Sequence, residues 1–313
     1  MSHQIPSHQT FIVSSTNVKE LTGSVDEGAL SHLISNHDEA DTRLILHACD
    51  CLKASDTVVI RTVDTDVLVI ALHHLQAMQR HTDQDVIMHL GTGVHKRYIS
   101  LAQLHTHMPS DVRDNMMAAY ALTGCDTTSG LFRITKSRAV ATLETSKYEI
   151  SGLGDVDDPL NLHCREECHR FLAGLYGDYP NLTEARYKSY ANRITKTESQ
   201  LPPSANAADY HIKRAAYQLI LWKSALTAVV GNLPAVTDFG WNQAMRPVMC
   251  DPSPVHDKLL ISCNCKTTRS EKNNCKCYKN SLRCTDACCC QNCANTPRQL
   301  IDGIDSSDED MSD

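Results

Sequence analysis

The sequence lacks any apolar run that approaches the roughly 18 residues needed to cross a bilayer. Its N-terminus, MSHQIPSHQTF, lacks the apolar core of a signal peptide. These two absences predict an intracellular protein with no membrane partner. The 16 histidines form no HExxH-like pattern, and the chain has no internal repeat. In a reducing compartment clustered cysteines bind metal more often than they form disulfides, so zinc is the first expectation for a cysteine cluster.

Basic side chains are absent from the last twelve residues, DGIDSSDEDMSD, which hold six acids. The formal net charge of the whole chain is -7, so the rest of the chain is close to neutral. This composition predicts a disordered acidic tail over residues 302–313. Residues 255–298, just before the tail, hold eight Lys or Arg against three acids. A basic segment and an acidic tail are therefore neighbours in the sequence.

Strand-like and helix-like segments alternate over residues 10–150. Strands are expected at Thr10–Ser15, at Thr57–Val63, and over the runs DVIMHLG and KRYISL. Helices are expected from about Glu39 to Ala54, from Pro109 and Ser110 to Gly124, and over SRAVATLE. Such alternation predicts an α/β fold in which a sheet is flanked by helices.

The second half of the chain divides differently. Residues 155–227 carry helical patterns, which predict a helical extension. Residues 228–257 are rich in Pro and Gly and are expected to form a linker or a wrapped loop. Residues 258–296 are expected to form a small zinc-cysteine module.

The string LISCNCKTTRSEKNNCKCYKNSLRCTDACCCQNCAN holds nine of the chain's 15 cysteines. Two cysteines one residue apart can reach a single ion from a tight turn, and a shell of thiolates alone is typical of structural Zn²⁺. The residues between them cannot bury a core, so bound metal has to supply the folding energy. The predicted zinc ligands are Cys263, Cys265, Cys275, Cys277, Cys284, Cys288, Cys289, Cys290 and Cys293.

This string resembles the tesmin-type CXC domain, whose motif runs CxC, C, CxC, C, CxC and a final C followed by Asn. Every cysteine of the string except Cys289 falls on the motif, and Asn295 supplies the trailing Asn. The resemblance implies three zinc ions held by nine thiolates, some of them bridging. The family's third cysteine is missing near Arg269 and Ser270, whereas Cys289 is additional. Either Cys289 completes a three-ion cluster, or eight thiolates hold two ions without bridges.

The same resemblance implies DNA binding. Relatives of this kind hold phosphates with basic side chains, and four residues here match that role: Lys266, Lys276, Lys279 and Arg283. This chain departs from the family in having one copy of the module and Asn274 where the family has Tyr. A purely structural zinc knot, or one that contacts protein, is the alternative.

Three strings in the α/β part place acids at the edges of apolar elements: HDEADTRL, TVDTDVLV and TGCDTTSG. Asp64 and Asp66 would point to one face if the chain were still extended there. Glu39 and Asp41 would both face the same pocket only if one of them preceded the helix. Carboxylates gathered in this way suit Mg²⁺ or Mn²⁺, and a pair of such ions can hold a phosphodiester for hydrolysis.

The order and spacing of these strings resemble the flap-endonuclease branch of PIN-like nucleases. The resemblance implies that Glu39 and Asp41 are the helix acids, Asp64 and Asp66 the strand acids, and Asp126 the last acid of the site. The family's first-strand acids have no counterpart in TFIVSS, so the expected PIN-like domain is N-terminally truncated. The combination with a CXC module is similar to a group of transposon-associated animal proteins.

Two hypotheses follow for the function. The first is a DNA-associated, Mg²⁺- or Mn²⁺-dependent endonuclease, or the relic of one, that its zinc module localises on DNA. The second is a non-catalytic DNA or chromatin adaptor with a vestigial active site. The missing first-strand acids favour this hypothesis, because an adaptor does not need them. Both predict DNA as a partner, chromatin proteins as further candidates, and a nuclear location.

Overall fold

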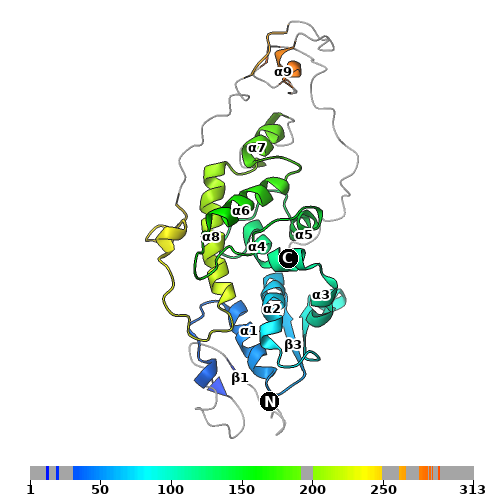
Figure 1. The fold of residues 1–313 in the computed structure, drawn as a ribbon, viewed down its shortest axis with the longest axis vertical. Coiled ribbons are helices and arrows are strands. Elements are labelled where there is room, and N and C mark those ends of the chain that lie inside the picture. The colour runs from blue at the N-terminus through cyan, green and yellow to red at the C-terminus, as the bar shows by residue number, and fades with distance from the viewer. Residues whose placement is uncertain are drawn as a thin grey trace.

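A computed structural model describes residues 12–13, 19–20, 31–191, 200–248, 261–265, 275–280, 282, 284 and 288–289 (Figure 1). Strands β1 (Ile12–Val13) and β2 (Lys19–Glu20) pair antiparallel in a two-stranded sheet of their own. The strand expected at Thr10–Ser15 therefore does not join the main sheet. The acidic tail over residues 302–313 lies outside the described residues.

The main sheet is small and mixed. It contains β3 (Thr57–Thr62), β4 (Asp85–Leu90) and β5 (Arg97–Ser100) in that order. Strands β3 and β4 are parallel, and β4 and β5 are antiparallel. Helix α2 (Thr65–Met78) connects β3 to β4, because parallel neighbours need a crossover rather than a tight turn. A short 3-10 turn, η2 (Gly93–His95), connects β4 to β5.

The main sheet buries only one of its faces. Side chains alternate across a strand, so Ile60 is buried while Val59 beside it is 58% exposed. On the neighbouring strands Met88 is buried and Tyr98 is 65% exposed. Helix α1 (Ala40–Cys51) contacts β3, and α2 and α3 (Leu101–His107) contact β4. The near-continuous apolar run at Thr57–Val63 therefore packs against the core with only one of its two faces.

Helix α4 (Ser110–Thr123) follows Pro109 and ends at Gly124, as the sequence predicted. Gly124 has a φ of 112°, and a Cβ there would lie 2.7 Å from the Cα of Gly130, so the turn requires glycine. The next helices are α5 (Lys136–Thr145), α6 (Leu162–Gly174), α7 (Leu182–Ala191) and α8 (Ala205–Lys223).

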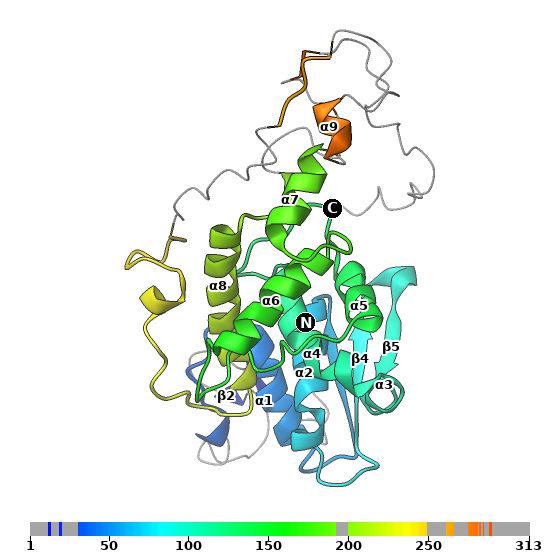
Figure 2. The ribbon, with the colours of Figure 1, turned by 45° about the horizontal axis from the view of Figure 1, so that its top comes forward.

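One hydrophobic core runs through the α/β part and the helices after residue 155. Helix α8 contacts α2, α4 and α6, and Figure 2 shows α4 and α2 between α8 and the strands β4 and β5. Two buried histidines reinforce this packing. The Nε2 atom of His74 donates to the carbonyl of Trp222, and that of His211 donates to the carbonyl of Leu122, each at 2.8 Å. The helical extension is thus part of the same packed body.

Residues 228–248 wrap back onto this body rather than leaving it. The side chain of Asn36 donates to the carbonyl of Val230 at 2.9 Å and accepts from the Val230 N–H at 2.8 Å. Beyond this clamp the 3-10 turn η4 (Val236–Phe239) packs on α8. The segment therefore brings Trp241 against the helices that follow the sheet.

The cysteine module lies beyond α7, at one end of the molecule (Figure 1). Its one described helix is α9 (Lys276–Lys279). Tyr187 of α7 is buried in a cluster with Leu282 and the thiols of the module. Among the described helices none is long and apolar enough to cross a membrane.

Candidate functional site

The first pair of predicted acids lies at the start of α1. Glu39 is the N-cap residue with an extended backbone, and Asp41 lies in the first helical turn. Side chains two positions apart on a regular helix point in nearly opposite directions. Glu39 precedes the helix, so its side chain need not point away from that of Asp41. The condition for both carboxylates to face one pocket, that one of them precede the helix, is therefore met.

The second pair lies where β3 gives way to α2. Asp64 is the N-cap residue of α2, and its Oδ1 accepts a hydrogen bond of 2.8 Å from the N–H of Asp66. The strand ends at Thr62, so the two acids do not share a face of an extended chain. Asp66 instead lies in the first helical turn and is buried, at 8% exposed.

Asp126 lies in the turn that follows α4. The flanking residues Cys125 and Thr128 exchange backbone hydrogen bonds of 3.2 Å, and the hydroxyl of Thr128 donates to the carbonyl of Ala121. The glycine at position 124 closes this turn. Asp126 is exposed, and its charge acts on Glu39, Asp41 and Asp66.

We call Glu39, Asp41, Asp64, Asp66 and Asp126 the carboxylate cluster, because burial and then the charges of the other four raise the pKa of Asp41 from 3.8 to about 6. No three of these carboxylates, all of them in the described part of the chain, have oxygen atoms within 4.8 Å of one another. Burial is also the main cause of the raised pKa of Glu39. Three separate segments thus deliver negative charge to one place.

Lys136, the first residue of α5, is the cation beside this cluster. Its Nζ lies 3.7 Å from Oδ1 of Asp66, donates to the carbonyl of Tyr120 at 2.7 Å and to that of Gly124, and lies over the Tyr120 ring. Burial raises the pKa of Asp66 to about 6 even though Lys136 opposes the shift. Burial also lowers the pKa of the Lys136 ammonium. The cluster is therefore only partly neutralised.

Sequence reasoning missed Gln218, which is 2% exposed on α8. Its Nε2 donates to both carboxylate oxygens of Glu39, at 2.8 and 3.1 Å, and its Oε1 accepts from the hydroxyl of Thr127 at 2.5 Å. Gln218 thereby ties α8 to the start of α1 and to the turn that holds Asp126. The one available signal was an amide in the otherwise apolar run YQLILW.

A cavity of about 310 Å³ adjoins the cluster, and we call it the Glu39 cavity. Glu39 and Gln218 belong to its wall, so it lies next to the carboxylates. The segment 228–248 supplies Trp241 and other apolar side chains to its lining. The sequence interpretation of that segment as a linker or loop gave no reason to expect a role in a site.

The cysteine module contains a four-thiol group, made of Cys263, Cys275, Cys277 and Cys284. All four are buried, and their sulfur atoms lie within 4.8 Å of one another. Sulfurs around a tetrahedral zinc ion, with Zn–S bonds of about 2.3 Å, lie about 3.8 Å apart. The Sγ of Cys284 is 3.7 Å from those of Cys263 and Cys275. This group can hold a metal ion such as zinc.

Three more of the predicted zinc ligands lie beside the four-thiol group. The Sγ of Cys288 is 3.5 Å from that of Cys277, and Cys265 interacts with Cys263 and Cys275. Cys289 differs, because it is exposed and its thiol donates to Oδ1 of Asn264 at 3.4 Å. Of the residues proposed to contact DNA, Lys276 and Lys279 are exposed on α9. Four predicted site residues lie outside the described residues: Cys290, Cys293, Lys266 and Arg283.

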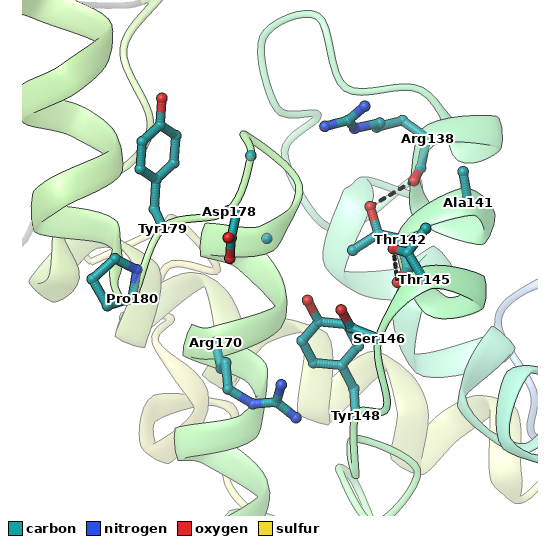
Figure 3. A pocket seen from close by; sticks show the side chains of 12 residues that line it. Arg138, Ala141, Thr142, Thr145, Ser146, Tyr148, Arg170, Asp178, Tyr179 and Pro180 are labelled. Carbon is teal, nitrogen blue, oxygen red and sulfur yellow. Dashed lines mark hydrogen bonds between the residues drawn. The ribbon is translucent and has the colours of Figure 1, made fainter.

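A larger cavity, of about 820 Å³, lies between α5 and the end of α6 (Figure 3). Figure 3 shows the hydroxyls of Tyr148 and Ser146 on one side and the Asp178 carboxylate on the other. Its two arginines are engaged at the wall. Arg138 donates to the carbonyl of Leu175, and Arg170 pairs with Glu167 and lies over the Tyr148 ring. None of the predicted site residues lines this cavity.

No family model, no curated protein and no solved structure matches this chain. The four-thiol group is therefore supported by its sulfur geometry, and the carboxylate cluster by the electrostatic influence of its members on one another.

Proposed function

We propose that this chain is a DNA-associated protein with a PIN-like, divalent-metal nuclease domain and a zinc-cysteine module that contacts DNA. The reaction would be phosphodiester hydrolysis in Mg²⁺ or Mn²⁺ by a structure-specific endonuclease derived from a transposable element. Its place of action would be the nucleus, where its DNA lies.

The observation that carries the proposal is the carboxylate cluster. Like charges are gathered there against their mutual repulsion, and the pKa of Asp41 is raised to about 6 by burial and by its neighbours. Perturbed carboxylates at one place are more frequent at functional sites than elsewhere. Hard divalent cations prefer oxygen ligands of this kind. The small α/β sheet, with acids following β3 and preceding α1, supports the PIN-like assignment.

The ligands for Mg²⁺ or Mn²⁺ would be the five carboxylates, Glu39, Asp41, Asp64, Asp66 and Asp126. Such ions, when bound, supply Lewis acidity towards a phosphate and lower the pKa of water. Gln218 fixes the orientation of the Glu39 carboxylate through its two hydrogen bonds. Asp41 and Asp66, with pKa values of about 6, can exchange protons near neutral pH when no cation holds them.

The zinc module would position the protein on DNA. Its four-thiol group can fix the fold of the module, and Lys276 and Lys279 are exposed on α9 to meet phosphates. Zinc binding in this module rests on the sulfur geometry, whereas DNA binding rests on the charge and exposure of the lysines and on the resemblance of its motif.

The test is cleavage of labelled single-stranded, duplex and flap DNA in Mg²⁺ or Mn²⁺. We expect cleavage by the wild type and its loss in Asp66→Asn and Asp126→Asn, whose carboxylates belong to the cluster. Asp83→Asn, which changes an exposed acid between α2 and β4, is the matched control and should retain cleavage. Absence of cleavage by the wild type on all three DNAs, with zinc bound, would contradict the enzymatic proposal.

The second candidate is a non-catalytic DNA or chromatin adaptor, and the position of Lys136 favours it. An ammonium group 3.7 Å from Asp66 supplies part of the positive charge that a cation would otherwise bring. An adaptor would need the cysteines and the lysines of the module but not the acids. DNA retention by the zinc-loaded wild type and by Asp66→Asn alike, without cleavage, would identify it.

A further inference from the structure

Two chemically different sets of side chains line the Glu39 cavity. We call the apolar set, which includes Leu221, Val230, Leu233 and Trp241, the apolar wall. We call the set at the start of α1, made of His37, Asp38 and Glu39, the polar wall. The cavity volume of about 310 Å³ lies near the lower end of the usual range for small-ligand sites, about 300–1,000 Å³. The cavity therefore has room for one flat, partly polar group.

The polar wall offers hydrogen-bond acceptors. Asp38 is exposed and accepts hydrogen bonds when ionised, whereas the oxygens of Glu39 already accept from Gln218 and offer only their remaining lone pairs. His37 is 6% exposed, and its Nε2 donates to the carbonyl of Thr227 at 2.7 Å, which leaves Nδ1 as an acceptor in the neutral ring. Within the described part of the chain this buried Nδ1 has no partner. The wall is suited to a ligand edge that carries N–H donors.

The apolar wall offers an aromatic ring with a cation over it. The guanidinium of Arg214 lies over the Trp241 ring, 5.7 Å from its centre, and its Nη1 donates to the carbonyl of Gly240 at 3.4 Å. A cationic ligand on this indole would be repelled by Arg214. A neutral aromatic ring can stack against this indole–guanidinium pair, and the phosphate of a nucleotide whose base stacks there would be attracted by the guanidinium.

We propose that the Glu39 cavity binds an unpaired nucleobase that carries an exocyclic amino group, and so holds one nucleotide of a single strand beside the carboxylate cluster. Adenine, cytosine and guanine present an amino donor on their hydrogen-bonding edge. Thymine presents a single N–H between two carbonyl oxygens, which the carboxylates repel. The proposal rests on the proposed function for naming DNA as the source of the base, but the binding step requires no cleavage.

The test measures binding without added Mg²⁺ or Mn²⁺, on the zinc-loaded full chain. The probes are fluorescein-labelled thymidine octamers in which one central position is cytosine, adenine, thymine or abasic. Base–aromatic stacking contributes about 1–3 kcal/mol, so the cytosine and adenine octamers should bind at least about fivefold more tightly than the abasic octamer. The thymine octamer should lie near the abasic one.

Trp241→Leu should remove these differences between octamers. The control is Tyr98→Leu, which removes an exposed aromatic side chain from β5 and should leave the differences intact. Trp241 packs on the core, so a second pair of variants uses Met245, which lines the cavity and is 60% exposed. Met245→Glu should weaken the cytosine octamer at low salt, because the new charge repels phosphate, and Met245→Gln should not.

Equal affinity of the wild type for all four octamers would overturn the base-binding proposal. So would base discrimination that survives in Trp241→Leu. Neither result bears on cleavage, which is measured in Mg²⁺ or Mn²⁺ with the variants of Asp66 and Asp126. Conversely, a protein that discriminates between bases but cleaves no DNA would support base binding in the Glu39 cavity and refute the nuclease proposal.

Discussion

The side-chain amide of Gln218 binds the carboxylate of Glu39, a residue 179 positions earlier in the chain. This contact joins the last long helix of the packed body to the first acid of the cluster. Because Gln218 also accepts from Thr127, one buried amide holds two of the three segments that bear the acids.

Gln218→Leu should therefore destabilise the protein. The substitution removes two hydrogen bonds from Glu39 and the acceptor of the Thr127 hydroxyl, and a buried polar group deprived of its hydrogen bond costs about 1–3 kcal/mol. We expect the free energy of unfolding, measured in urea at pH 7.5, to fall by that amount. Gln103→Leu, at an exposed position of α3, should change the free energy of unfolding by less than about 0.5 kcal/mol. Equal effects of the two substitutions would contradict the bridging role.

Asp41→Asn should stabilise the protein at neutral pH. The folded-state pKa of Asp41, about 6, lies above the unfolded value near 3.9, so ionisation is disfavoured by folding. The associated loss of stability is absent well below pH 4 and complete above pH 6. Asparagine cannot ionise, so the variant should gain about 1 kcal/mol at pH 7.5, a value reduced from the full shift because the carboxylate is half-exposed.

This gain should disappear as the pH is lowered from 7 to 4. Chemical unfolding at several pH values measures it, with Asp83→Asn as the exposed comparison. A gain that is independent of pH would show that the effect comes from packing and not from charge repulsion in the cluster.

Lys136→Gln should tighten the binding of Mn²⁺ if the cluster is a metal site. The ammonium contributes a positive charge 3.7 Å from Asp66, and its removal leaves the carboxylates more negative towards an incoming cation. We expect a several-fold lower Kd by calorimetry at pH 8, where competition from protons is small. Lys147→Gln, an exposed lysine just after α5, is the matched control. Weaker Mn²⁺ binding in Lys136→Gln would mean that the lysine supports the site.

Cys284→Ser should lower the zinc content of the protein, whereas Cys289→Ser should not. Cys284 is a buried member of the four-thiol group, with sulfurs at 3.7 Å on two sides. Cys289 is exposed and bonds to Asn264 instead. Native mass spectrometry counts the ions directly. Loss of zinc in Cys289→Ser would favour the alternative in which this additional cysteine completes a three-ion cluster.

The helix ends beside Glu39 and Asp126 were predictable from local sequence, whereas the expectation of an extended chain at Asp64 and Asp66 is wrong. Glu39 and Asp64 are N-cap residues, and such residues can be recognised beside an apolar periodic run. Gly124 could be identified as a helix stop because a positive φ favours glycine. Local sequence therefore predicted α1 and α4, which carry Glu39 at the start of one helix and Asp126 after the end of the other.

The partners of the acids were not predictable in the same way. Gln218 and Lys136 reach the cluster only because α8 and α5 pack against α4, and no local pattern encodes that packing. The Glu39 cavity depends further on the clamp between Asn36 and Val230, which are 194 positions apart. Contacts of this separation are set by how helices bury their apolar faces together, which a single sequence leaves open.

The separation between Glu39 and Gln218 also sets a time order during protein synthesis. At about 5–20 residues per second, a ribosome needs about 10–35 s to travel the 179 positions between the two residues. Strands β3 to β5 and helices α1 to α4 can meet in that interval with the carboxylate of Glu39 still lacking its amide partner. The nascent chain thus carries the Glu39 carboxylate throughout this interval before α8 supplies its amide partner.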